Sequence, residues 1–249
     1  MIKKLLKSIN AIKLRNYFSI RPTYFNISYL EKNISISDGF FWRLDDNFST
    51  IFKFSNLIKL YFNEDSSVEI YFFDNRNNFL NNIELNISTY SSEIKIDKNL
   101  VKNKTYGVFY IFHKSNKKLN SMIRNSCYVG YSYNGNLHSF VHGNTPSAKT
   151  KISEKHAMKK YDLSSSSLMK KKYFVQNSFR NINAEIFLLN STSSKQKIFI
   201  NKNVFHLNPG NCEIYKIKED DIIKIESNCY LLRPIIFEYN KQYLNVYHG

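Results

Sequence analysis

The sequence predicts an all-β protein built from two tandem antiparallel β-sandwich domains, preceded by a short basic helix. Three observations lead to this prediction: runs of β-branched and aromatic residues at short intervals, turn-forming residues between these runs, and two stretches that repeat one another. The chain has 249 residues, of which 43% are hydrophobic. This length suits one large domain or two small ones with cores of their own.

Residues 1–36 are predicted to form a basic N-terminal arm that is partly helical. Within Met1–Asn16, apolar residues recur at helical spacing and lysines occupy the positions between them. Such a helix can lie on an anionic membrane surface, although it more often docks on its own domain or on a partner subunit. Peripheral membrane contact through residues 1–16 is therefore one expectation for this arm.

Residues 37–146 are predicted to form the first sandwich, and residues 173–249 the second. The clearest element of the first is a hairpin with arms near Val68–Phe73 and Phe79–Ile87. Another of its strands is expected over Ile58–Phe62. In the second unit, strand-like runs follow one another at the spacing that is typical of a sandwich.

Residues 147–172 are predicted to be a Lys/Ser-rich linker between the sandwiches. This segment combines four consecutive serines with blocks of lysine that cannot bury themselves. We expect a short helix within it, over Ser153–Tyr161. Lys170, Lys171 and Lys172 end the segment and are candidates for binding an anion.

Two stretches, Asn125–Gly143 and Ser227–Gly249, resemble one another. Each opens with Cys-Tyr, passes through an Asn-containing turn and ends in His-Gly. We interpret them as the same closing hairpin in two copies of one sandwich, with turns at Asn134-Gly135 and Asn240-Lys241. An internal duplication of the chain is therefore predicted.

The net charge of +16 suggests a nucleic-acid partner, because lysine and arginine neutralise phosphates. However, the chain is rich in residues with AT-rich codons, which accounts for much of the basicity, so we do not expect nucleic acid as the main partner. Three scattered cysteines indicate reduced, buried thiols. Without a long apolar run or a secretory signal, the expected location is cytoplasmic, with peripheral contact at the inner membrane as the alternative.

The most concentrated polar and aromatic cluster is Ser37–Asp46. It holds the only tryptophan, Trp42, next to Arg43, and it includes Asp38 and Asp45. An aromatic ring can pack on the apolar face of a sugar while carboxylate and guanidinium groups bind its hydroxyls. These four residues are our first candidates for a ligand site. The alternative is that the aromatic residues fill the core and Arg43 pairs with an aspartate.

Three histidines, His138, His142 and His248, complete the candidate ligand site. His142 and His248 each precede a glycine at the end of a predicted strand, where imidazole offers a donor and an acceptor. The competing interpretation is that they only end strands by bonding a neighbouring carbonyl. His138 and His142 would lie about 13 Å apart on one strand, too far to share a metal. No cofactor, nucleotide or metal motif is present, so we expect no cofactor and no metal.

The order SDGFFWRLDD, TIFKF, YGVFYIFH, CYVGYSYN, SFVHGN and a closing LRPIIF–YHG resembles an uncharacterised group of bacterial proteins associated with surface-polysaccharide biosynthesis. The resemblance spans Ser37–Gly249 and implies a glycan context without a catalytic assignment. Our leading hypothesis is a non-catalytic β-sandwich protein that binds a glycan or a protein partner. An enzyme that acts on a glycan or nucleotide sugar by His and Asp acid–base chemistry is the second hypothesis. Nucleic-acid binding through the Lys-rich segment is the third.

Overall fold

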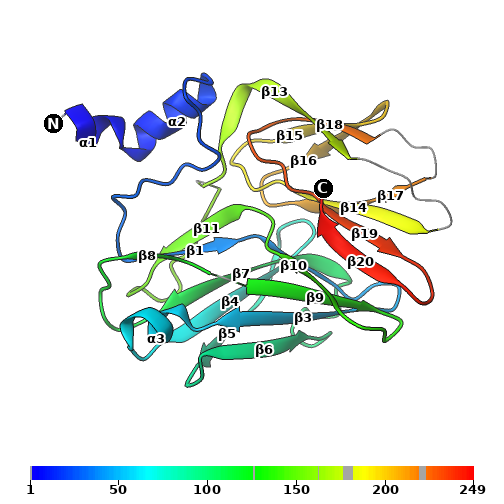
Figure 1. Ribbon diagram of the computed structural model, residues 1–249, viewed down its shortest axis with the longest axis horizontal. Coiled ribbons are helices and arrows are strands. Elements are labelled where there is room, and N and C mark those ends of the chain that lie inside the picture. Colours follow the sequence, from blue (N-terminus) through cyan, green and yellow to red (C-terminus); the bar gives the residue numbers. More distant parts are fainter. Residues whose placement is uncertain (1, 126, 162, 176–181, 219–222) are drawn as a thin grey trace.

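The computed structural model describes residues 2–125, 127–161, 163–175, 182–218 and 223–249. The protein is mostly β-structure, with two sandwiches and a pair of short helices at its N-terminus (Figure 1). None of the helices in the described part of the chain is long and apolar enough to cross a membrane. The helices are α1 (Ile2–Leu6), α2 (Ile9–Tyr17) and α3 (Leu57–Phe62).

The first sandwich contains eight strands: β2 (Phe40–Arg43), β3 (Phe48–Ser55), β4 (Ser67–Asp74), β5 (Phe79–Asn86), β6 (Ser91–Ile96), β7 (Tyr106–Lys114), β9 (Cys127–Tyr133) and β10 (Ser139–His142). They form two antiparallel sheets with the orders β2-β7-β4-β5 and β10-β9-β3-β6. The predicted hairpin is confirmed as β4 and β5. The predicted strand Ile58–Phe62 is wrong, because α3 occupies it. Asn56 caps this helix by accepting a hydrogen bond from the backbone N–H of Lys59 at 3.1 Å.

The second sandwich contains the last eight strands: β13 (Ser166–Val175), β14 (Asn183–Leu189), β15 (Gln196–Ile200), β16 (Asn203–Leu207), β17 (Cys212–Ile217), β18 (Ile223–Cys229), β19 (Ile235–Tyr239) and β20 (Leu244–His248). Its sheets have the orders β13-β18-β15-β16 and β17-β14-β19-β20. All the pairs in both sheets are antiparallel. The predicted all-β fold with tandem sandwiches is therefore confirmed.

The two sandwiches have the same topology. In chain order, β2–β7 correspond to β13–β18, and β9 and β10 correspond to β19 and β20, with matching neighbours in both sheets. This match supports the predicted duplication, and it makes His142 and His248 equivalent, since each ends the last strand of its sheet. The Cys-Tyr pairs are not equivalent, because Cys127 opens β9 whereas Cys229 closes β18.

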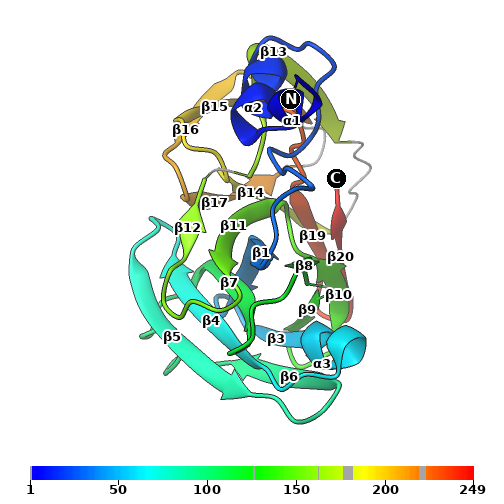
Figure 2. The ribbon, with the colours of Figure 1, turned by 90° about the vertical axis from the view of Figure 1, so that its left-hand side faces the viewer.

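A fifth sheet lies between the sandwiches and has the order β12-β11-β1-β8 (Figure 2). Its strands are β1 (Ile34–Asp38), β8 (Met122–Arg124), β11 (Pro146–Lys151) and β12 (Lys159–Lys160). Segment 147–172 is therefore not a solvated linker, since β11, β12 and the start of β13 occupy much of it. Nor does Ser153–Tyr161 form a helix; it contains turns and β12. Three of the four serines, Ser164, Ser165 and Ser167, are buried with hydrogen-bond partners: Ser164 Oγ, for example, donates to the carbonyl of Pro146 at 3.0 Å.

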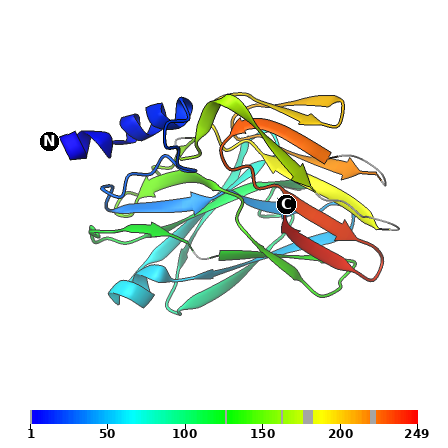
Figure 3. The same cartoon turned by 45° about the horizontal axis from the view of Figure 1, so that its top comes forward.

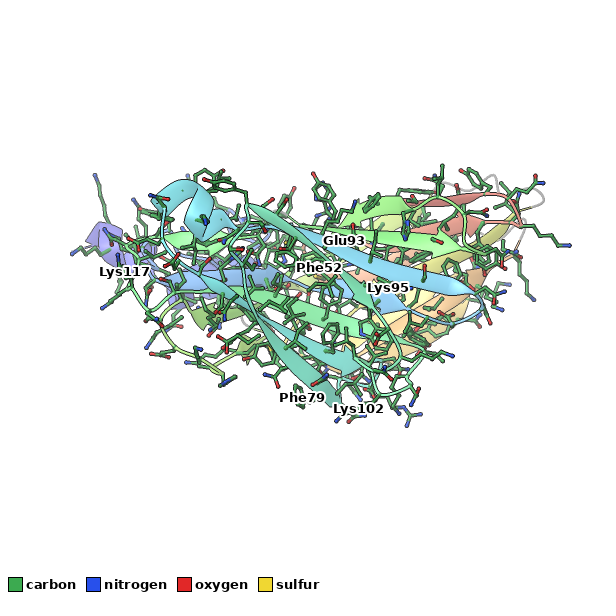
Figure 4. The ribbon with its side chains drawn as sticks, turned by 90° about the horizontal axis from the view of Figure 1, so that it is seen from below. Phe52, Phe79, Glu93, Lys95, Lys102 and Lys117 are labelled. Carbon is green, nitrogen blue, oxygen red and sulfur yellow. The ribbon has the colours of Figure 1, made fainter. Side chains whose placement is uncertain are left out.

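The two sandwiches share one core. The sheet β17-β14-β19-β20 is covered on both faces, by the first sandwich on one side and by the core of its own sandwich on the other. Phe41 stacks on Phe187 with 3.8 Å between ring centroids, whereas Ile186 and Ile236 face the second core. Strand β14 is therefore buried without the alternation of a half-exposed strand. Figure 4 shows the first sandwich from below, with Phe52 among the sheets and Lys117 at the edge.

The predicted N-terminal helix is present, but it is divided into α1 and α2. Ser8 lies at the division and caps α2, accepting a hydrogen bond from the backbone N–H of Ala11 at 3.4 Å. The two helices project beside the beginning of β13 (Figure 3). The arm thus lies against the second sandwich, although the chain continues from it into the first.

Candidate functional site

Trp42 lies in the core and is not exposed to pack on a sugar ring. Its side chain is fully buried, and its indole Nε1 donates to the carbonyl oxygen of Phe73 at 3.2 Å. A Cβ at Gly107 would approach the indole ring to 2.8 Å, so the ring has no room to move on that side. Trp42 fills the core, as the alternative interpretation held.

Arg43 and Asp45 also have a structural role. Arg43 is fully buried over the ring of Phe48 and donates to Asp45 at 2.7 Å and to Glu185 at 2.8 Å. Burial opposes the charged form, but the hydrogen bonds and charges of Asp45 and Glu185 outweigh it and raise the pKa of Arg43. Tyr239 adds a further hydrogen bond by donating its hydroxyl to Glu185 at 3.0 Å. This cluster joins the two sandwiches and offers nothing to a ligand.

Asp38, by contrast, lies at the edge of a surface cleft. It ends β1, and the parallel neighbour β8 ends at Arg124. The guanidinium of Arg124 donates Nε and Nη2 to the two carboxylate oxygens of Asp38, each at 3.0 Å. This two-point contact fixes the Asp38 carboxylate and partly neutralises it.

The cleft has a volume of about 300 Å³ and collects polar side chains from both sandwiches. Gly143 is required at its wall, because a Cβ there would lie 2.5 Å from the Cβ of Asp38. Of the described residues that line the cleft, Asp38 is the one carboxylate. The lining residues are Asp38, Arg124, Asn125, Cys127, His142, Gly143 and Arg233.

Arg233 gives the cleft an uncompensated positive charge. It is half-buried, and its guanidinium makes no ion pair or hydrogen bond with another residue that the structure describes. Burial lowers the pKa of Arg233; the charge of Asp38 opposes this shift and that of Arg124 adds to it. An arginine stays protonated at neutral pH even so. The cleft is therefore suited to an anion, which would give Arg233 the partner that it lacks.

Two of the candidate histidines lie at this end of the molecule because the two closing hairpins meet. The backbone N–H of Val246 in β20 donates to Ser139 Oγ in β10 at 2.9 Å. His142 is exposed, and its ring lies against that of Tyr128 at a tilt of 40°, with 4.4 Å between ring centroids. The pKa of His248 is lowered to about 4 by burial and by the charges of Arg233 and His142, while backbone groups of Pro234 and His142 oppose the shift.

The remaining candidates lie elsewhere. His138 is exposed in the turn before β10, where its ring contacts Phe140. Lys170, Lys171 and Lys172 lie on the edge strand β13, on the side of the second sandwich that faces α2. No group of three or more His, Cys, Asp or Glu residues in the described part of the chain could hold a metal ion.

Cys127 lines the cleft, but it is not suited to nucleophilic chemistry. Its side chain is buried, and burial followed by the charge of Asp38 raises the thiol pKa well above its usual value. A protonated thiol is a weak nucleophile. Burial likewise raises the pKa of Cys229, to about 11.

The two arginines of the cleft were not predicted from the sequence. One signal was available: the chain has only seven arginines among 36 basic residues. In a lysine-dominated sequence, an arginine marks a position where a planar group with several donors matters. Such positions are occupied by Arg43, Arg124 and Arg233.

Comparisons with protein-family models, curated proteins and solved structures found no match to this chain.

Proposed function

We propose that this protein is a non-catalytic binding protein and that its ligand is an acidic glycan, held in the cleft between Arg124 and Arg233. The observation that carries this proposal is the half-buried guanidinium of Arg233, which has no ion-pair or hydrogen-bond partner among the described residues and lies beside a cavity that is large enough for a sugar unit. A carboxylate or phosphate on a sugar is the planar or multivalent acceptor that a guanidinium binds best.

Aromatic surface next to the cleft supports a sugar over a simple inorganic anion. Tyr128 is 42% exposed, and its ring lies tilted against that of His142, which lines the cleft. A ring face of this kind packs against the apolar face of a pyranose, while Asn125 and His142 offer hydrogen bonds to its hydroxyls. The resemblance to bacterial proteins of surface-polysaccharide biosynthesis is consistent with such a ligand, and we place the protein in that context as part of the proposal.

Isothermal titration calorimetry with D-glucuronate and with oligogalacturonate, against D-glucose and a neutral dextran fragment, tests the proposal. We expect heat only from the acidic sugars. Arg233→Met keeps most of the side-chain volume and removes the charge-assisted hydrogen bonds, so affinity should fall by roughly tenfold or more. Arg76→Met is the matched control, because Arg76 is exposed in the β4–β5 turn. Equal responses to acidic and neutral sugars, or equal affinity of the Arg233 variant, would disprove the proposal.

Acid–base catalysis on a glycan is the second candidate, because His142 and Asp38 line the same cleft. Three features weaken it. His138 and Asp45 lie outside the cleft lining, Arg124 holds Asp38 at both oxygens, and the pair of carboxylates used by most glycosidases has only one member among the described lining residues. Release of reducing sugar from oligogalacturonate, lost in His142→Gln, would favour the enzyme over the binding protein.

A further inference from the structure

We infer that a second surface, formed by α2, the residues that follow it and the start of β13, docks on a membrane that carries anionic lipids. This inference does not depend on the proposed function of the cleft. We call this area the basic–apolar surface. Its exposed large apolar residues are Leu14, Tyr17, Phe18, Ile20, Leu168 and Met169.

Helix α2 docks on the second sandwich with a polar side chain inward. Asn16 is 1% exposed, and its Nδ2 donates to Ser165 Oγ at 2.6 Å and to Asn26 Oδ1 at 2.8 Å. A surface helix usually turns its apolar stripe to the core. Here Leu14 is 61% exposed and Phe18 54% exposed. Ile12 is buried together with Asn16, so the helix is fixed in place while Leu14 and the following Phe18 remain exposed.

The start of β13 extends this surface. Ser19 Oγ lies 2.9 Å from Ser167 Oγ, and the hydroxyl of Tyr230 donates to Ser19 Oγ at 2.7 Å. These contacts hold the end of α2 next to β13, as Figures 1 and 3 show. The next residues along β13, Leu168 and Met169, are 63% and 69% exposed. The two segments that carry these exposed apolar side chains therefore lie side by side, although they are far apart in the sequence.

The segments that carry these apolar residues are strongly basic. Residues 1–30 contain six lysines and arginines and no aspartate or glutamate, and Lys170, Lys171 and Lys172 directly follow Met169. Each cation close to an anionic bilayer strengthens binding roughly fivefold, and apolar side chains inserted at the interface add to it. Stable peripheral binding requires two contributions of this kind, and this surface combines cations with exposed apolar side chains.

A cavity beside the helix favours lipid over an apolar protein partner. It has a volume of about 340 Å³ and opens next to Leu14 and Tyr17. Hydroxyl groups can donate hydrogen bonds to a phosphate, so the cavity suits a lipid headgroup whose chains lie along the apolar side chains. Ser166 and Ser193 line it with hydroxyls, whereas the hydroxyls of Ser164 and Thr192 already donate to the carbonyl of Pro146 and to Asn190 Oδ1.

Vesicle co-sedimentation of the full chain tests this inference. We expect binding to vesicles of phosphatidylcholine with phosphatidylglycerol and little binding to phosphatidylcholine alone. The triple variant L14S/F18S/L168S should lower the partition coefficient by about tenfold or more, and K170Q/K171Q/K172Q by on the order of 100-fold. The control L60S/Y61S/L137S changes residues of the first sandwich that are 52%, 72% and 91% exposed and should bind like the wild type.

All the substituted side chains are exposed or lie on an edge strand, so each variant should keep the wild-type melting temperature by circular dichroism. Failure of the wild-type chain to bind the anionic vesicles would overturn the inference, as would equal losses in the apolar and control variants. Equal binding to phosphatidylcholine alone would remove the role of charge. The surface would be assigned to nucleic acid if a single-stranded oligonucleotide displaced the vesicles and if binding depended on the lysines but not on Leu14, Phe18 and Leu168.

Discussion

Replacing Glu185 by glutamine removes one charge from an ion pair that joins the two sandwiches. Arg43 Nη1 lies 2.8 Å from Glu185 Oε2, and the two side chains are 0% and 3% exposed. Loss of one partner from a buried pair costs about 3–5 kcal/mol, because the remaining charge is buried without compensation. Arg43 keeps Asp45, at 2.7 Å. We therefore expect E185Q to lose about 3 kcal/mol of unfolding free energy, at the lower end of that range.

Urea unfolding measures this loss with two probes. Trp42 fluorescence reports on the first sandwich, and far-ultraviolet circular dichroism reports on both. Because the sandwiches share a core, the two transitions should coincide in the wild type and move together in E185Q. Glu93→Gln is the control: the Lys53–Glu93 pair, at 3.1 Å, is half-exposed on both sides, so its loss should cost less than about 1 kcal/mol. A loss in E185Q as small as in the control, or wild-type transitions that separate, would refute the reasoning.

Three further predictions concern single residues. Burial lowers the pKa of His113 to about 4, below its value in the unfolded chain, so the free energy of unfolding should fall by roughly 3 kcal/mol as the pH falls from about 6.5 toward 4. His113→Leu should flatten this pH dependence in urea titrations at several pH values. A pH dependence that is unchanged in the variant would exclude His113 as its source. Gly143→Ala places a Cβ 2.5 Å from that of Asp38, so it should lower the free energy of unfolding by about 1–3 kcal/mol and weaken glucuronate binding in calorimetry. Unchanged binding would show that the wall of the cleft tolerates the methyl group. Trp42→Phe removes the indole donor from the carbonyl of Phe73 and should lower the unfolding free energy by about 1–3 kcal/mol, whereas no change in the urea midpoint would mean that this hydrogen bond contributes little.

Strand content could be predicted because alternation and turn residues are local signals. The β4–β5 hairpin followed from two β-rich arms around the turn formers Asp74–Asn78. The same signals misassigned Ile58–Phe62, since a short apolar run fits either a strand or a helix, and the cap at Asn56 favours the helix. In segment 147–172 the composition indicated a flexible linker. It could not reveal that β1 and β18 would supply hydrogen-bond partners.

The candidate site, too, could be predicted from the sequence only in part. Ser37–Asp46 was selected for its residue types, but burial decides whether a tryptophan packs on a ligand or in a core, and burial depends on the sheets around it. Asp38 and His142 were named among the candidates, whereas Arg124 and Arg233 were not. They lie 109 positions apart in a chain of 249 residues, and only the meeting of β8 with the end of the second sandwich brings them to one cleft.

By itself the sequence determined the β-class, the repeat of one sandwich and the basic helical arm, because each depends on periodicity and turn chemistry that act over a few neighbouring residues. Only the tertiary structure decided that the two sandwiches share a core, that Arg43 pairs with Glu185 and Asp45, and that the guanidinium of Arg233 lies near Asp38 with no ion-pair or hydrogen-bond partner among the described residues. These outcomes depend on which distant side chains exclude water from one another, and that is a property of packing rather than of any local pattern.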